Sequence, residues 1–514
     1  MDPISMNSYN VSSLLRIGGL ATGLDTDSIV KQLMKVASLP LDKLNQQKQW
    51  YQWQQEDLRD INAKLMNLRN NVVASLRLQS TFMAKTVTSS NPSVATATAG
   101  ANAVNGTYIL NVQNLAKAAY RTGNGFNTDP NTALGKAGTI KINNVSISIT
   151  PDDSLNTIIS KINNSTAGVT VTYDASLGRV FFISKTTGQS AKIDFTGSDA
   201  GGYDVLTNNF KITGLTLDST TNTVTDGSIA SGEDAEFTIN NDPTKIYKST
   251  NSFTLLGLNI TLTGTGTTNL TVSTDVDKIY NTIKNFVDTY NDVITQMHTK
   301  LTEKRYYDYP PLTDEQKQAM KENDIKLWEE KARSGDLAND ETLMRAYYSL
   351  RQAISSTVSG AGSLSSIGIT TGQWYEGGKL YIDEAKLKDA IANNLNSVIQ
   401  IFTGVYSSDG TTLVSKGIAQ QLYGYFENGT FKEGVLGTAI NAITRKAGSS
   451  TQLYDNSFIG NRIREIDDRI AEMQKRLKDL EDRYYRQFSQ LEIFVGQMNT
   501  QSAWLNQQIG IMTK

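Results

Sequence analysis

The sequence contains no cysteine and only one histidine, His298, in 514 residues. The absence of cysteine excludes disulfides, thiol catalysis and cysteine-based zinc sites. One histidine cannot provide a two-histidine metal site, and its position near the end of a helical pattern favours a structural role. With 51 Asp and Glu residues, some carboxylates always lie close together, so carboxylate-pair chemistry stays open. We expect no metal, no cofactor and no enzymatic activity.

The sequence also lacks a large excess of charge of one sign, and it lacks long apolar runs. The net charge of −2 gives no electrostatic basis for binding nucleic acid or an anionic membrane. No apolar run approaches the ~20 residues that a membrane-spanning helix needs. The first residues, MDPISMNSYNVSSLLRIGG, show no basic segment followed by an apolar one, which a secretory signal would have. We therefore expect no nucleic-acid partner, no membrane insertion and no cleaved signal peptide.

Glycines precede an apparent helix start in GLATGLDTDSIVKQLM. Gly18 and Gly23 have the spacing of a phosphate-binding P-loop, but Leu24 stands where that loop needs lysine. The pattern instead predicts that Asp25 or Thr26 caps a helix.

Seven-residue apolar repeats predict seam helices on both sides of a strand-rich middle. Leu39-Pro40 should separate a helix over 25–38 from a longer one over 41–80, because proline disfavours helix in the preceding residue. The two seams, which we expect to pack on each other, comprise Leu44, Tyr51, Leu58, Leu65 and Val72, and then Val276, Ile279, Ile283, Phe286, Tyr290, Val293 and Met297.

The middle of the chain, 86–273, is rich in Thr, Ser, Asn and Gly, and its apolar residues alternate as they do in strands. Asp153 is the predicted cap of one helix within it. Further on, Thr313 and Gln316 form a capping box. A β-hairpin is expected near 365–382 with Gly377-Gly378 as its turn. The fold class predicted is α+β and multidomain, with β-rich modules inserted into a helical bundle.

The last fifty residues show another seam helix, which begins as Ile463, Ile466, Ile470, Met473, Leu477 and Leu480. Beyond residue 487 only Glu492 and Lys514 are charged, and Gln487, Gln501 and Gln508 occupy seam positions. A helix with such an incomplete seam is marginal alone, because packing supplies most helical stability. We expect the residues before 40 and beyond 487 to become ordered only when a partner covers them.

These patterns predict five parts. They are an N-terminal leg (1–40), a helical bundle (41–85 with 274–486), one β-rich module (86–120 with 230–273), a second (121–229) and a C-terminal leg helix (487–514).

Both chain ends resemble the flagellar hook-associated protein 2 family, the filament cap proteins. GLATGLDTDSIVKQLM looks like the family's N-terminal signature, and RYYRQFSQLEIFVGQMNTQSAWLNQQI is similar to its C-terminal end. LNTIISKINNSTAGVTVTYDASLGRVFFISKTTG resembles the IN motif of flagellin and hook-associated proteins. The Tyr309-Pro310-Pro311 tract resembles forms from Gram-positive bacteria.

The resemblance implies a structural cap at the distal end of the flagellar filament, outside the cell, that promotes flagellin polymerisation and prevents loss of flagellin monomers. It implies export through the flagellar type III pathway. The implied partners are further copies in a pentamer-like ring, flagellin, the hook-filament junction protein, an export chaperone and the export apparatus. The implied leg interface pairs Leu20, Leu24, Ile29 and Leu33 with the seam of Leu491, Phe494, Met498 and Leu505.

Three alternatives stay open. The inserted modules could make the protein a surface adhesin for host glycan or mucin, which is compatible with capping. A polysaccharide-acting enzyme on a helical stalk is a second alternative. Another exported axial protein, such as a junction protein or flagellin, is the third.

Overall fold

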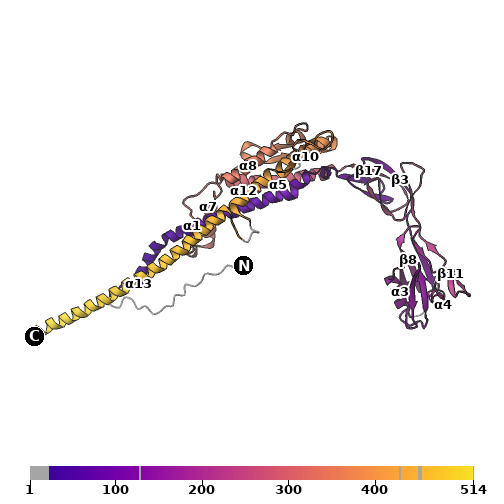
Figure 1. Cartoon of the computed structure of the whole chain (residues 1–514), viewed down its shortest axis with the longest axis horizontal. Coiled ribbons are helices and arrows are strands. Elements are labelled where there is room, and N and C mark those ends of the chain that lie inside the picture. Colours follow the sequence, from indigo (N-terminus) through magenta and orange to yellow (C-terminus); the bar gives the residue numbers. More distant parts are fainter. Residues whose placement is uncertain (1–21, 127–128, 428–429, 450–453, 513–514) are drawn as a thin grey trace. The chain divides into compact units, whose positions relative to one another are not determined.

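The computed structural model describes residues 22–126, 129–427, 430–449 and 454–512 (Figure 1). The chain divides into two compact units. The helical unit contains the chain up to Gln79 and from Tyr280 onward, and the β-rich unit is Ser80–Ile279. Long helices dominate one unit and β-sheets dominate the other, so the predicted α+β multidomain class is confirmed. No helix among the described residues is long and apolar enough to cross a membrane.

The helical unit is built on three long helices, α1 (Thr26–Asn67), α5 (Val276–Thr302) and α13 (Phe458–Met512). A π-helical turn (Leu68–Val73) and α2 (Ala74–Leu76) extend α1. The remaining helices are α6 (Asp314–Ala319), α7 (Glu322–Arg333), α8 (Glu341–Ile354), α9 (Glu384–Asn393), α10 (Leu395–Thr403), α11 (Ile418–Tyr423) and α12 (Val435–Ala447).

Helix α1 runs through Pro40 without a break, so the predicted separation at Leu39-Pro40 is wrong. A proline inside a helix removes one backbone hydrogen bond and costs ~3 kcal/mol. Tertiary packing outweighs that cost, because Val30 and Leu44 are both buried on either side of Pro40. The start of the helix follows the sequence pattern: the Asp25 side chain accepts a hydrogen bond from the Ser28 backbone N–H.

The apolar repeats of α1 and α5 face the interior. Tyr51 is half-buried, and the other predicted seam residues are buried, namely Leu44, Leu58, Leu65 and Val72 on α1 and Ile279, Ile283, Phe286 and Tyr290 on α5. The two helices run antiparallel, since Lys64 pairs with Asp292 at 3.1 Å and the Gln296 amide contacts Asp60. Helices α12 and α13 also pack on α1, so α1 is enclosed from several sides.

Between residues 303 and 404 the structure departs from the sequence-based expectations at two places, a helix and a hairpin. The capping box at Thr313 and Gln316 is present, but the helix that it opens ends at Ala319 before α7 begins. The hairpin consists of β18 (Ile369–Thr371) and β19 (Leu380–Ile382). Its connection is longer than the predicted Gly-Gly turn, because a 3-10 turn (Trp374–Glu376) precedes two glycines with left-handed backbone conformations.

The helical unit also holds two smaller hairpins. They are β20 (Val405–Tyr406) with β21 (Leu413–Ser415), and β22 (Gly424–Glu427) with β23 (Thr430–Glu433).

The β-rich unit contains two hydrophobic cores. The first lies between a five-stranded sheet in the order β1-β17-β3-β13-β14 and a three-stranded sheet in the order β15-β16-β2. Its strands are β1 (Lys85–Ser89), β2 (Ala95–Ala99), β3 (Gly106–Asn114), β13 (Ala235–Ile239), β14 (Ile246–Lys248), β15 (Ser252–Leu255), β16 (Leu258–Leu262) and β17 (Gly266–Thr274).

The second core is that of the IN-like module, where α3 (Leu155–Asn164) and the sheet β4-β8-β7 contribute the apolar residues. Its other elements are β4 (Ala118–Asn124), β5 (Gly138–Ile142), β6 (Val145–Ile149), β7 (Val169–Asp174), β8 (Arg179–Thr187), β9 (Lys192–Ile193), α4 (Ala200–Asp204), a π-helical turn (Val205–Asn209), β10 (Thr216–Asp218), β11 (Thr223–Asp226) and β12 (Ala230–Ser231).

The cap of α3 is Ser154, whose hydroxyl accepts a hydrogen bond from the Thr157 backbone N–H, and the prediction of Asp153 is wrong. Asp153 instead accepts from the Thr150 backbone and pairs with Lys161 at 2.5 Å. The Asp153 carboxylate is thus engaged with Thr150 and Lys161, and the adjacent Ser154 caps the helix.

Candidate assembly surfaces

Helices α1 and α13 form an antiparallel pair in the helical unit (Figure 1). The Thr22 hydroxyl donates a hydrogen bond of 2.5 Å to Glu492, and Lys48 pairs with Asp467 at 2.6 Å. Along this pair Ile466 of α13 is buried, while the other predicted seam residues are half-buried, namely Ile463, Ile470, Met473, Leu477 and Leu480. Helix α1 covers only one side of α13 and α12 adds a smaller contact, which explains the partial burial.

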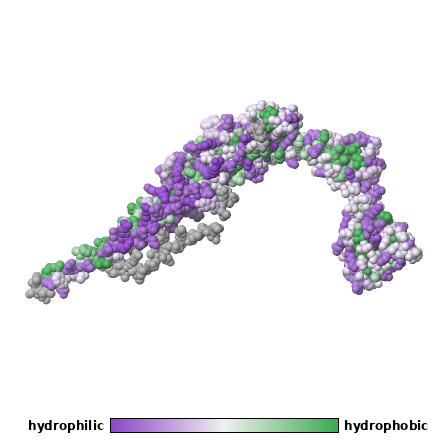
Figure 2. Space-filling model, viewed as in Figure 1, coloured by the Kyte–Doolittle hydropathy of each residue, from purple (hydrophilic) through white to green (hydrophobic). Residues whose placement is uncertain are grey.

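Beyond the contact with Thr22, α13 presents an apolar stripe. Every described side chain from Gln497 onward is exposed, and Leu491, Phe494, Met498 and Leu505 are 42%, 59%, 55% and 51% exposed. Their spacing places the four on one face of the helix. Figure 2 shows hydrophobic surface gathered along this end of α13. We call these four residues the leg stripe.

The N-terminal part of the predicted leg interface is only partly covered in the single chain. Leu24 and Leu33 are 42% and 39% exposed, and Val30 is the buried apolar residue of this segment. Residues after Thr22 run toward the Ile466 end of α13, away from Met498 and Leu505. The predicted pairing of these residues with the leg stripe therefore stays a prediction. Ile29 is half-buried, and Leu20 lies outside the described residues.

The buried face of α13 also drifts from the strict seven-residue repeat. Gln487, a predicted seam position, is exposed, whereas Phe488 and Val495 are half-buried. A straight helix with 3.6 residues per turn rotates relative to a 3.5-residue repeat, so the contact line moves to the next position after several turns.

A cluster of charged side chains joins α1, α5 and the end of α7. Asp57 is contacted by Lys300 Nζ and by Arg333 at 2.5 Å, and Arg333 also pairs with Glu56 at 3.1 Å. Asp336 has a fully buried side chain and lies 3.5 Å from Lys300. These contacts tie the segment after α7 to the two long helices.

Burial and the neighbouring Asp57 carboxylate raise the pKa of Asp336 to about 7. The Arg333 and Lys300 hydrogen bonds overcome burial at Asp57 and lower its pKa. The Oδ2 atom of Asp336 lacks a partner among the polar contacts of the described residues, and the protonated Asp336 carboxyl donates a hydrogen bond to Asp57. The pair therefore holds one proton, on Asp336, below about pH 7.

This proton gives the helical unit a pH-dependent stability. Asp336 in the unfolded chain titrates near 3.8, so its contribution is complete below that pH and is lost as the pH rises through about 7. We expect Asp336→Asn to gain on the order of 2 kcal/mol relative to the wild type between pH 5 and pH 8. Urea unfolding of both proteins at each pH measures the difference between their free energies of unfolding. Contributions from other titrating groups are the same in both proteins and cancel in this difference. Equal pH profiles would contradict the assignment.

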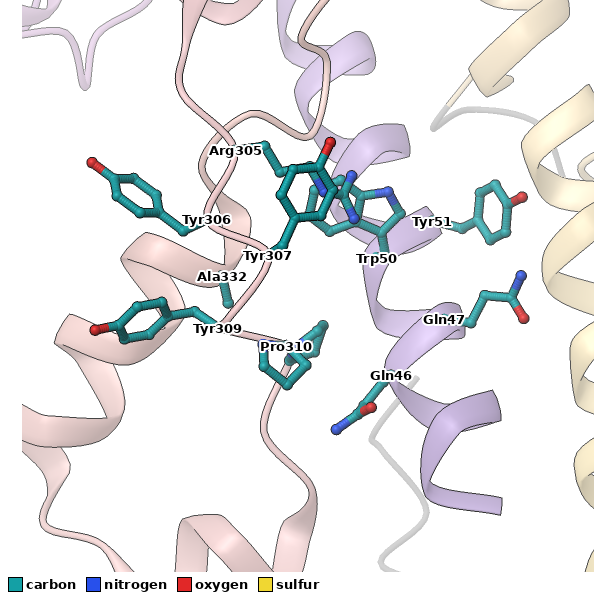
Figure 3. Close-up of a pocket in the computed structure, with 11 residues that line it drawn as sticks. Gln46, Gln47, Trp50, Tyr51, Arg305, Tyr306, Tyr307, Tyr309, Pro310 and Ala332 are labelled. Carbon is teal, nitrogen blue, oxygen red and sulfur yellow. The ribbon is translucent and has the colours of Figure 1, made fainter. Parts of the chain in front are cut away.

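A cleft of about 350 Å³ lies where the segment after α5 crosses α1 (Figure 3). The guanidinium of Arg305 lies 3.5 Å from the ring centre of Trp50 and 5.2 Å from that of Tyr307. Trp328 of α7 donates a hydrogen bond of 2.8 Å to the Pro310 carbonyl. These cation–π and polar contacts hold the Tyr-Pro segment, and with it α7, against α1.

Comparison with known proteins assigns the family. The profile "Flagellar hook-associated protein 2 C-terminus" matches residues 232–500, and its N-terminus counterpart matches residues 22–119. The "Flagellin hook IN motif" profile matches residues 136–186. A flagellar hook-associated protein 2 from Halalkalibacterium halodurans is 31% identical over 96% of this chain and 99% of its own length. The chain belongs to the flagellar hook-associated protein 2 family.

Other relatives of this family member span nearly the same length. The flagellar hook-associated protein 2 of Thermotoga maritima is 26% identical over 98% of each chain, and that of Escherichia coli is 26% identical over 97% of this chain and 98% of its own. The crystal structure of the flagellar cap protein FliD D1-D2-D3 domains from Escherichia coli matches with a TM-score of 0.52 and 23% identity. That match covers 80% of this chain and 99% of the other, and it shows a common fold.

Sequence reasoning about this flagellar hook-associated protein found the leg stripe but missed the charged cluster. The stripe follows from apolar spacing along one helix. Asp57, Lys300 and Asp336 are far apart in the sequence, and each alone looks like an ordinary surface charge. A hint was available in Asp57 and Lys300, which stand next to the apolar seams of their helices.

Proposed function

We propose that this family member forms a homo-oligomeric cap at the distal end of the bacterial flagellar filament. It promotes flagellin polymerisation there and prevents the loss of exported flagellin monomers. The relatives are flagellar hook-associated proteins, which supports the flagellar role, and the leg stripe supports an assembly role. A helix end that exposes four large apolar residues on one face gains stability when another molecule covers it.

The mechanism that we propose relies on contacts of moderate strength. The ends of α1 and α13 act as legs toward the filament, and neighbouring molecules cover Leu24, Leu33 and the leg stripe. The stripe is interrupted by glutamine and carries almost no charge, so its contacts are neither fully apolar nor locked by ion pairs. A leg of this kind can release and rebind each time a flagellin subunit is added.

The proposed partners are other copies of the chain in a pentamer-like ring, flagellin, the hook-filament junction protein, an export chaperone and the flagellar export apparatus. The protein acts outside the cell at the flagellum tip, which it reaches through the flagellar type III pathway. No catalytic role is proposed.

Deletion of the gene tests the capping function. We expect deleted cells to release monomeric flagellin into the medium and to lack filaments, and the wild-type gene to restore filaments. Electron microscopy of the cells and immunoblotting of the medium measure the two effects. Normal filaments on deleted cells would overturn the proposed function.

Adhesion is a second candidate, because one face of the sheet β4-β8-β7 is open. Tyr120 and Ile183 lie opposite each other across β4 and β8 and are 52% and 39% exposed. The Phe181 ring lies 6.1 Å from that of Tyr120. Aromatic rings on an open face suit stacking on sugars. If the full chain binds mucin and Tyr120→Ala abolishes this binding, the result would support adhesion. Unchanged binding by Tyr120→Ala would show that this surface is not the binding site.

A further inference from the structure

Helices α8 and α12 border a groove of about 680 Å³ in the helical unit. The two helices pack against each other. The residues of these helices that line the groove include several small ones, namely Thr342, Ala346 and Ser349 of α8 and Thr438, Ala439 and Ala442 of α12. A surface of this shape accommodates the ridge of another helix, with room for one or two large side chains.

The rim of the groove is basic. Arg345, Lys416 and Arg445 line it together with one carboxylate, Glu433. Glu433 accepts a hydrogen bond of 2.9 Å from Asn441. Arg345 pairs with Glu341 at 3.0 Å, but both side chains are at least 80% exposed, and such a pair contributes little. The groove therefore presents uncompensated positive charge around an uncharged floor.

Helix α7 of the same unit has the complementary character. Leu327 is 60% exposed, although a leucine usually packs inward. Asp324 and Glu330 stand three residues before and after it, so the three share one face. Both carboxylates are exposed, and neither forms an ion pair within the described part of the chain. Lys331 also lies on this face, and its Nζ donates a hydrogen bond of 3.3 Å to the Tyr309 hydroxyl.

We propose that α7 of one copy docks in the α8–α12 groove of the next copy. Leu327 lies on the alanine floor, and Asp324 and Glu330 face Arg345 and Arg445. The contact deepens the proposed function, because it rests on the homo-oligomeric cap and names the surfaces that join its copies. Two different complementary surfaces on one chain make a head-to-tail contact, which produces a ring when the rotation closes.

Charge exchange in the full chain tests this contact. We expect Arg345→Glu with Arg445→Glu, and separately Asp324→Arg with Glu330→Arg, each to weaken self-association about tenfold. The fourfold variant should recover association, because the signs match again. Sedimentation over a concentration series measures it. Asp389→Arg on α9, an exposed carboxylate that lines neither surface, is the control, and circular dichroism melts check the folding of every variant.

Disulfide trapping gives a second readout, since the chain has no cysteine of its own. Chains with Leu327→Cys are mixed with chains with Ala442→Cys under oxidising conditions, in solution and at filament tips. We expect a cross-linked dimer, and none when Asp389→Cys replaces Leu327→Cys.

The outcomes separate this contact from the capping function. A fourfold variant that associates no better than either pair, together with no 327–442 cross-link, would overturn the contact. If only the groove pair weakens self-association, a different surface of this chain occupies the groove and the contact is again wrong. Loss of filaments on gene deletion would still support capping in both cases.

Discussion

Replacing Met498 and Leu505 by aspartate is expected to abolish filament growth without unfolding the protein. Both side chains are more than half exposed in the single chain, so the charges cost little in the free monomer. In the assembly each would be an uncompensated charge in an apolar contact, at a cost of about 3–5 kcal/mol. Complementation of the deletion strain, with filaments counted by electron microscopy, measures the loss.

A matched variant places the same two charges elsewhere on the helix. Thr500→Asp with Gln507→Asp adds aspartates on the side of α13 opposite Met498 and Leu505, and both residues are exposed. We expect filaments with this control. If the control also removes filaments, added charge rather than the leg stripe explains the effect. Normal filaments with the Met498 and Leu505 variant would show that nothing covers the stripe.

The largest loss of stability is expected for Phe286→Ala. Phe286 of α5 is 1% exposed, and its ring packs edge-on against Phe402 of α10 with the centres 6.0 Å apart. Truncation leaves a cavity between α5 and α10, and such changes cost about 3–5 kcal/mol. The free energy of unfolding of the helical unit, followed by circular dichroism at 222 nm in urea, measures it. Phe286→Leu, which keeps most of the volume, should cost much less.

Tyr290→Phe, one turn further along α5, provides the opposite control. The Tyr290 hydroxyl is buried without a hydrogen-bond partner among the described residues, and burial raises the pKa of the phenol. Removing an unsatisfied hydroxyl is expected to leave stability unchanged or to raise it by about 1 kcal/mol. A loss comparable to that of Phe286→Ala would indicate that any change in α5 disrupts the unit, and would contradict the cavity explanation.

Order at the chain ends also remains to be measured. The sequence predicts that the segments before 40 and beyond 487 become ordered only with a partner, whereas the structure describes 26–40 and 487–512 as helix. The predicted borders of the five parts stay predictions in the same way. The two cores of the β-rich unit place Ala116 in one and Ala119 in the other, close to the predicted change at 120.

Local patterns in the sequence were sufficient for features that depend on neighbours in the chain. The seven-residue repeats give the buried faces of α1 and α5, because side chains three and four residues apart share a side of a helix. The cap at Asp25 and the box at Thr313 follow from short-range hydrogen bonds. The leg stripe belongs to the same class, since it requires only apolar spacing along α13.

Only the tertiary structure decided features in which distant residues compete with a local preference. Pro40 favours a helix break, but packing on both sides carries α1 through it. Asp336 holds its proton only because folding buries it beside Asp57, and the groove between α8 and α12 exists only because the two helices pack against each other. The sequence by itself therefore determined which faces are apolar and where helices start. Tertiary packing decided which of those faces are covered, because burial depends on the partner that folding brings alongside.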